Sequence, residues 1–135
     1  MRKLTSVLLV DDDSTTNFLN KLLFSRLGIT EKLIVTENGE EALTALEGLC
    51  SAATPDCPNL ILLDVNMPVM NGFEFLEAYQ QLSPAQRQST VVMLLTTSVH
   101  QRDLARVHQL PIAGTITKPL TQEKLRLLWQ QHFPE

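Results

Sequence analysis

Carboxylate, hydroxyl and ammonium side chains follow directly after short apolar runs in this sequence. They are Asp11 and Asp12 after the first run, Asp64 after the third, Thr96 after the fourth and Lys118 after the fifth. Clustered carboxylates repel one another, and a hard cation such as Mg²⁺ relieves the repulsion by taking their oxygens as ligands. A lysine supplies positive charge for an anion, and a threonine hydroxyl can donate a hydrogen bond to it. Together these residue types suit a phosphoryl group beside Mg²⁺, with a carboxylate as nucleophile.

Each of these residue types also has an ordinary structural role. Asp and Thr after strands commonly form turns or begin helices, and a lone lysine is usually solvated. Asp13 and Ser14 are therefore expected to begin the first helix, and Thr97 is expected to cap or pack rather than to react. Only the convergence of several such side chains on one edge of a sheet favours a functional site.

The apolar runs predict five strands of a parallel sheet. They are solid rather than alternating, which is typical of strands covered by helices on both faces. The runs occupy residues 7–10, 33–35, 60–63, 91–95 and, more weakly, 112–116. Their alternation with helical segments predicts an α/β fold, an open sheet with right-handed crossovers and a site beyond the carboxyl ends of the strands.

Helical spacing and capping signals define the segments between the runs. The first helix is recognised from the spacing of its apolar residues, which are Phe18, Leu19, Leu22, Leu23 and Leu27. Asn38, Asn71 and Ser98 each precede a Glu or Gln by three positions, which is the spacing of a capping box. Thr121 is expected to begin the last helix, and residues 51–59 are expected to form a surface loop.

Composition and length exclude several classes of protein. The sequence has 135 residues, 44% of them hydrophobic, which predicts one ordinary globular domain over residues 1–135 without an output domain. Its formal charge of −4 lacks the basic excess of a nucleic-acid-binding domain. No run approaches the ~20 apolar residues of a membrane span, and the N-terminal run has no signal-peptide cleavage site. We therefore expect a cytoplasmic protein. Cys50 and Cys57 could form the disulfide of a secreted protein, but free thiols are favoured, and no zinc site is expected.

Four segments resemble the signature of two-component response regulator receiver domains. They are residues 7–13, 62–72, 94–96 and 117–119, and the part from Asp64 to Gly72 is the most diagnostic. The resemblance covers essentially the whole chain. It implies a flavodoxin-like, CheY-like (βα)5 fold with a doubly wound five-stranded parallel sheet and the strand order 2-1-3-4-5.

The resemblance implies a role for each matched acidic position. Asp64 would be the phosphoacceptor, whose carboxylate attacks the phosphoryl group of a phosphohistidine. Asp11 and Asp12 would be the acidic pair that supports Mg²⁺, and Asp64 would bind the metal as well. Asn66 would add its backbone carbonyl to the protein ligands of the ion.

The resemblance also implies how the site responds to the phosphoryl group. Lys118 would pair with the phosphoryl oxygens, next to a cis peptide bond to Pro119. Thr96 would be the hydroxyl that swings toward the phosphoryl group. The family often has a Tyr or Phe on the fifth strand as the second part of the switch, but Thr115 stands there. We still expect phosphorylation to change residues 98–110.

These implied roles describe a stand-alone signalling protein rather than an enzyme with turnover. The phosphoryl group would come from a sensor histidine kinase or a histidine phosphotransfer protein. The signal would leave by contact with an unidentified downstream protein or by phosphorelay, without direct nucleic-acid binding or membrane insertion.

Three other kinds of protein use some of the same residue types. A haloacid-dehalogenase-like aspartyl phosphatase also uses Asp, Mg²⁺, Thr and Lys, but it needs a second acid where Asn66 stands, and a cap for which the chain has little room. A flavodoxin needs a phosphate-binding loop, and three aspartates in that loop would repel a flavin phosphate. A receiver that no longer accepts phosphate is disfavoured because every matched site residue is present.

Overall fold

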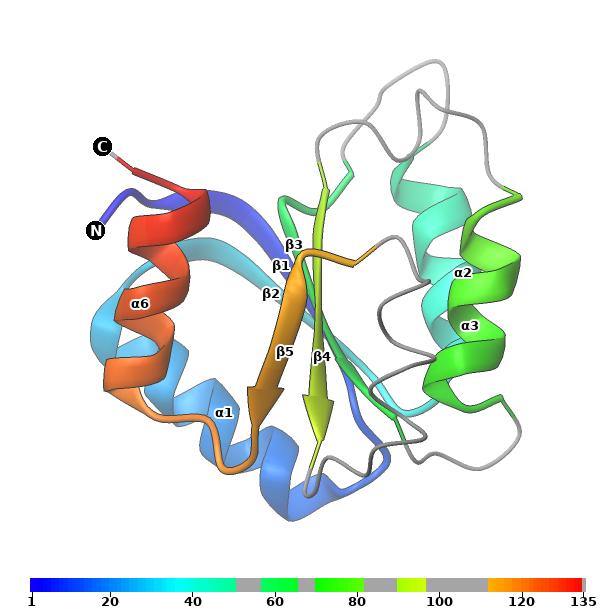
Figure 1. The fold of residues 1–135 in the computed structure, drawn as a ribbon, viewed down its shortest axis with the longest axis horizontal. Helices are drawn as coiled ribbons and strands as arrows, with labels where there is room; N and C mark the ends of the chain where they lie inside the picture. Colours follow the sequence, from blue (N-terminus) through cyan, green and yellow to red (C-terminus); the bar gives the residue numbers. More distant parts are fainter. Residues whose placement is uncertain (51–56, 66–69, 82–89, 97–111, 135) are drawn as a thin grey trace.

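One parallel five-stranded sheet organises the protein. The structure is a computed structural model that describes residues 1–50, 57–65, 70–81, 90–96 and 112–134. The elements are β1 (Leu4–Val10), α1 (Ser14–Leu27), β2 (Thr30–Thr36), α2 (Gly39–Leu49), β3 (Leu60–Asp64), α3 (Gly72–Tyr79), β4 (Val91–Thr96), β5 (Gly114–Thr117) and α6 (Gln122–His132). The strand order β2-β1-β3-β4-β5 confirms the predicted fold (Figure 1).

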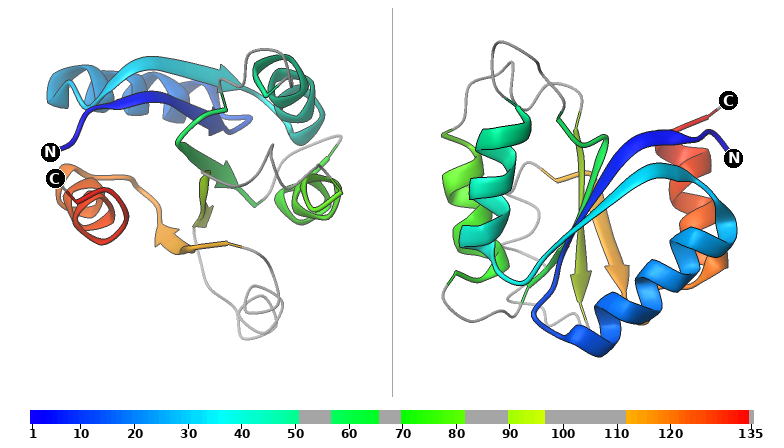
Figure 2. Two further views of the ribbon diagram at one scale, coloured as in Figure 1. Left: turned by 90° about the horizontal axis from the view of Figure 1, so that it is seen from above. Right: turned by 180° about the vertical axis from the view of Figure 1, so that it is seen from behind.

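Helices cover both faces of the sheet. Figures 1 and 2 show α1 and α6 on one face and α2 and α3 on the other. Alternate residues of each central strand point to opposite faces. Leu9 therefore packs with Phe24 and Trp129, whereas Leu8 packs with Phe75 of α3. This two-sided burial explains why the strands read as solid apolar runs.

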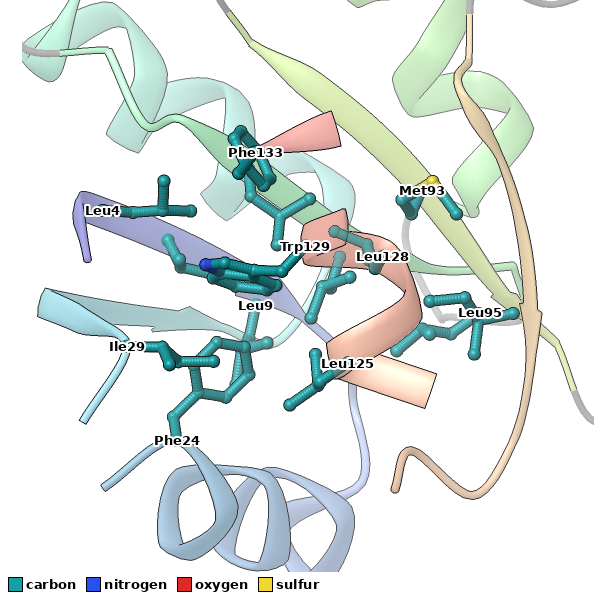
Figure 3. Close-up of a cluster of buried hydrophobic side chains, with 14 residues drawn as sticks. Leu4, Leu9, Phe24, Ile29, Met93, Leu95, Leu125, Leu128, Trp129 and Phe133 are labelled. Carbon is teal, nitrogen blue, oxygen red and sulfur yellow. The ribbon is translucent and has the colours of Figure 1, made fainter. Parts of the chain in front are cut away.

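The larger core cluster lies between the sheet, α1 and α6 (Figure 3). The rings of Phe24 and Trp129 meet edge to face, with their centroids 6.2 Å apart. Trp129 also donates a hydrogen bond from Nε1 to the carbonyl oxygen of Arg2 at 2.7 Å. This contact joins α6 to the beginning of the chain and satisfies the polar atom of a buried indole.

The buried face of α1 differs from the apolar positions that identify the helix in the sequence. Phe18, Leu19 and Leu22 are 61%, 57% and 46% exposed. The buried residues of α1 are instead Asn17, Asn20 and Phe24. The helix therefore presents an apolar strip to the outside and two amides to the interior.

The predicted helix starts agree with the structure where it describes them. Asn71 forms a complete capping box with Glu74. The side chains of Asn38 and Thr121 accept hydrogen bonds from the third residue beyond them and begin α2 and α6. Asp13 begins α1, as expected, by accepting from the backbone N–H of Thr15. The Ser98 signal lies outside the described residues.

Two expectations need correction. Cys50 and Cys57, for which free thiols were favoured, form a disulfide: they are seven positions apart in the sequence, and their Cα atoms lie 4.7 Å apart. The fifth strand begins at Gly114 rather than at Ile112, because its parallel pairing with β4 starts only where Gly114 lies beside Met93. Among the described helices, none is both long and apolar enough to cross a bilayer.

Replacing Phe24 by alanine should destabilise the protein strongly, because its ring is 2% exposed and fills the core under Trp129. We expect a loss of ~3–5 kcal/mol in the free energy of unfolding, measured by urea denaturation. Phe18→Ala on the same helix is the control, with an expected change within about 0.5 kcal/mol, because the Phe18 ring is exposed. Equal losses in the two variants would show that the assigned helix face is wrong.

Candidate functional site

Three carboxylates meet at the carboxyl edge of the sheet. The parallel register pairs Val10 of β1 with Leu63 of β3, so the residues that follow them lie side by side. Asp11, Asp12 and Asp64 each offer an oxygen within 4.8 Å of the others. Asp11 and Asp64 are buried and Asp12 is exposed. Such a set of hard oxygen ligands, open on one side, suits Mg²⁺ with part of its water shell.

Lys118 reaches two of the three carboxylates. Its Nζ lies 2.7 Å from Asp11 Oδ2 and 3.2 Å from Asp64 Oδ1. The ammonium therefore offsets part of the repulsion between the two buried acids. Asp11, Asp64 and Lys118 follow three different predicted strands in the sequence. In the structure Lys118 contacts both acids.

The surroundings of Asp64 and Lys118 shift the pKa values of both side chains. Burial raises the pKa of Asp64, the neighbouring Asp11 raises it further, and Lys118 opposes both effects. Burial alone would lower the pKa of Lys118, but the hydrogen bond and charge of Asp11, together with Asp64, outweigh it and raise that pKa. The Lys118 ammonium thus favours the charged form of both buried carboxylates, against the burial that disfavours it.

Hydrogen bonds hold the backbone N–H, the carbonyl and the carboxylate of Asp11. Its N–H donates to the carbonyl of Thr36 at 3.1 Å, and its carboxylate accepts from the N–H of Asp13 at 2.9 Å. Its carbonyl accepts from Nδ2 of Asn17 at 2.8 Å. Sequence analysis missed Asn17, because an amide on a helix gives no signal until the buried face of that helix is known.

The segment around Lys118 is also held on both sides. Its N–H donates to the carbonyl of Thr96 at 2.8 Å, which ties it to the end of β4. The Lys118–Pro119 peptide bond is cis, in agreement with the family resemblance. Nζ of Lys124, at the start of α6, donates to the carbonyls of Thr117 and Pro119. Lys124 is a second residue that the sequence did not point to.

The remaining predicted residues are only partly described. Thr96 ends β4 and is half-buried, beside Thr117 in the parallel register. Thr115, at the position where the family often has an aromatic residue, is exposed on β5. Asn66, Thr97 and residues 98–110 lie outside the described residues. The predictions for the metal-binding carbonyl and for the responding segment therefore stay predictions.

The start of α3 lies very close to the backbone of Asp64 and Val65. Gly72, the first residue of α3, donates its N–H to the carbonyl of Val65 at 2.9 Å. A Cβ at Gly72 would lie 2.7 Å from the carbonyl oxygen of Asp64. Only glycine therefore allows α3 to begin this close to the strand end that carries the candidate nucleophile.

An apolar groove borders the acidic site. It has a volume of about 620 Å³ and lies between α1 and the loop that follows Lys118. Leu19, Leu22 and Leu23 line one side, and Pro119 and Leu120 line the other. A partner that covered this groove would also face Lys118 at its rim.

Comparisons with known proteins agree with this geometry. The family model described as the response regulator receiver domain matches residues 7–130. The chain belongs to the response regulator receiver family. Response regulator Rcp1 of Synechocystis is 31% identical over 112 residues, which cover 83% of this chain and 75% of that protein. The chain thus has the architecture of a signalling domain rather than of a conventional enzyme.

Two further relatives place the receiver domain in different protein contexts. The autoinducer 1 sensor kinase/phosphatase LuxN of Vibrio campbellii is 31% identical over 121 residues, which cover 90% of this chain but only 13% of that protein. A two-component response regulator structure from Cytophaga hutchinsonii has a TM-score of 0.86 and 32% identity, and the match covers 99% of this chain and 100% of that one. The receiver fold is therefore shared in full, whereas the activities of the longer relative belong to that relative.

Replacing Gly72 by alanine should damage the receiver domain, because the new methyl group would overlap the Asp64 carbonyl. We expect a loss of ~1–3 kcal/mol in the free energy of unfolding, measured by urea denaturation. Gly48→Ala in α2 is the matched control, because nothing lies within 4 Å of a Cβ there. That variant should gain about 0.5–1 kcal/mol from helix propensity. A neutral Gly72→Ala would contradict the close approach.

Proposed function

We propose that this receiver domain accepts a phosphoryl group on Asp64 from a phosphohistidine and signals through the phosphorylated state. One observation carries the proposal. Asp64 is a buried carboxylate at a strand end, beside two further carboxylates and 3.2 Å from the Lys118 ammonium, in a chain of the receiver family. Phosphoryl transfer needs this positioning and charge neutralisation more than it needs covalent help.

The transfer itself follows from the chemistry of the carboxylate. An oxygen of Asp64 would form a bond to phosphorus while the P–N bond of the phosphohistidine breaks, and the leaving imidazole would take up a proton. The product is an acyl phosphate on Asp64. Asp11, Asp12 and Asp64, with the carbonyl of Asn66, would hold Mg²⁺, which offsets the negative charge of the acids and the phosphoryl group.

Lys118 and Thr96 would act on the phosphoryl oxygens. Lys118 contacts Asp11 and Asp64 in this structure. A phosphoryl group on Asp64 adds negative charge, so the ammonium would turn toward the phosphoryl oxygens. The Thr96 hydroxyl would donate a hydrogen bond to the same group. This exchange of partners is the local event from which a change of conformation could start.

The partners follow from the same chemistry. The phosphodonor would be a sensor histidine kinase or a histidine phosphotransfer protein, and its surface would cover the apolar groove and the exposed Leu19 and Leu22 beside Lys118. The receiver of the signal would be a downstream protein or the next member of a phosphorelay. Residues 1–135 would act as one receiver unit in the cytoplasm, and the chain would undergo one phosphorylation per site rather than catalyse turnover.

Phosphorylation should add one phosphoryl group to the wild-type protein after incubation with acetyl phosphate and Mg²⁺. Intact-mass spectrometry measures the added mass. Asp64→Asn should remain unmodified, because an amide cannot form the acyl phosphate. Asp13→Asn is the control, because asparagine begins a helix as well as aspartate does, and it should be modified like the wild type. An unmodified wild-type protein, or an equally modified Asp64→Asn variant, would refute the assignment.

Mg²⁺ should stabilise the folded protein, because it binds carboxylates that folding brings together. A metal concentration one hundred times the Kd should add about 2.7 kcal/mol, and thermal unfolding with and without Mg²⁺ measures the gain. Asp64→Asn should lose most of the gain, whereas Asp13→Asn should keep it. Equal stabilisation of these two variants would place the metal elsewhere.

A further inference from the structure

Lys124 makes two contacts that its place in the sequence does not explain. Its Nζ donates to the carbonyl of Thr117 at 2.6 Å and to the carbonyl of Pro119 at 3.0 Å. These carbonyls belong to the residues immediately before and after Lys118. The ammonium group of Lys124 thus binds the backbone on both sides of Lys118.

Lys124 lies at a position of α6 where a positive charge does not stabilise the helix. Its backbone N–H donates to the Thr121 hydroxyl that begins α6, so it lies in the first turn. The positive end of the helix dipole lies there, and a cation in this turn is disfavoured. The two carbonyl contacts offset that cost. Glu123, next to Lys124, is the residue type that a first turn favours.

The contacts leave the Lys118 segment with little freedom. The N–H of Lys118 donates to Thr96 of β4, and Lys124 holds the carbonyls on either side of it. The Lys118 side chain therefore reaches Asp11 and Asp64 from a backbone that is bonded to both the sheet and α6. Small displacements of this backbone matter, because the stabilisation of charge depends on where the ammonium meets the reacting group.

We propose that Lys124 is a positioning residue for Lys118: it holds the Thr117 and Pro119 carbonyls so that the Lys118 ammonium meets the phosphoryl group on Asp64. The proposal rests on the proposed phosphorylation of Asp64. Lys124 itself touches neither the carboxylates nor the phosphoryl group. Its effect therefore passes through Lys118, and that dependence can be measured.

A double-mutant cycle tests this dependence. The rate of phosphorylation by acetyl phosphate at saturating Mg²⁺ is compared for the wild type, Lys124→Gln, Lys118→Gln and the double variant. Lys124→Gln should be about fivefold slower, which is the size of effect expected from the loss of one typical hydrogen bond. In the Lys118→Gln background the same change should have no further effect, since the two act through one group.

Two variants separate positioning from charge. Lys124→Arg keeps donors for both carbonyls and should retain most of the rate. Arg126→Gln removes one positive charge from an exposed position of the same helix and should match the wild type. The Mg²⁺ affinity should stay unchanged in Lys124→Gln, because the metal-binding carboxylates do not contact Lys124. The backbone amide resonance of Lys118 should move in Lys124→Gln and not in Arg126→Gln.

Each result bears on the proposal. An unchanged rate in Lys124→Gln, a fivefold loss that persists without Lys118, or an unmoved Lys118 amide would overturn it. Loss of folding in Lys124→Gln would also overturn it, because that result would assign the side chain to the fold. If the wild type is not phosphorylated, the proposed function fails, and the Lys118 amide resonance still decides whether Lys124 holds the segment.

Discussion

The repulsion between buried carboxylates is the constraint on which this structure depends. Asp11 and Asp64 lie at the ends of neighbouring strands and are both almost fully buried. In this arrangement Lys118 lies within ion-pair distance of both acids. Burial and the neighbouring Asp11 raise the pKa of Asp64, and the Lys118 ammonium opposes that shift. The repulsion that makes the site costly to fold is also what a bound cation would relieve.

Most of the fold could be predicted because its signals are local and agree with one another. Solid apolar runs, capping residues and strand-end acids each indicate a parallel α/β sheet, and the register then places Asp11, Asp12 and Asp64 together. What the sequence did not indicate depends on long-range geometry. Asn17 and Lys124 look like ordinary helix residues until the structure shows which backbone carbonyls they reach.

The expectations that need correction also depend on long-range geometry. Helical spacing identifies α1, but it does not say that Phe18 and Leu22 point outward while Asn17 points inward, because another strip of the same helix faces the core. The pairing of Cys50 with Cys57 depends on a Cα–Cα distance that residue types do not reveal, and the composition favours free thiols. Patterns of residue type indicate elements well, but they do not indicate which face of an element the rest of the chain will cover.

Position 115 bears on how the proposed signal could leave the site. Thr115 is exposed on β5 and carries no ring that could rotate inward on phosphorylation. The backbone on either side of Lys118 is nevertheless bonded to Lys124 on α6 and to Thr96 on β4. A movement of Lys118 toward a phosphoryl group would therefore act on a helix and a strand through main-chain carbonyls. A route through the backbone needs no aromatic residue, so its absence at position 115 is compatible with a working switch.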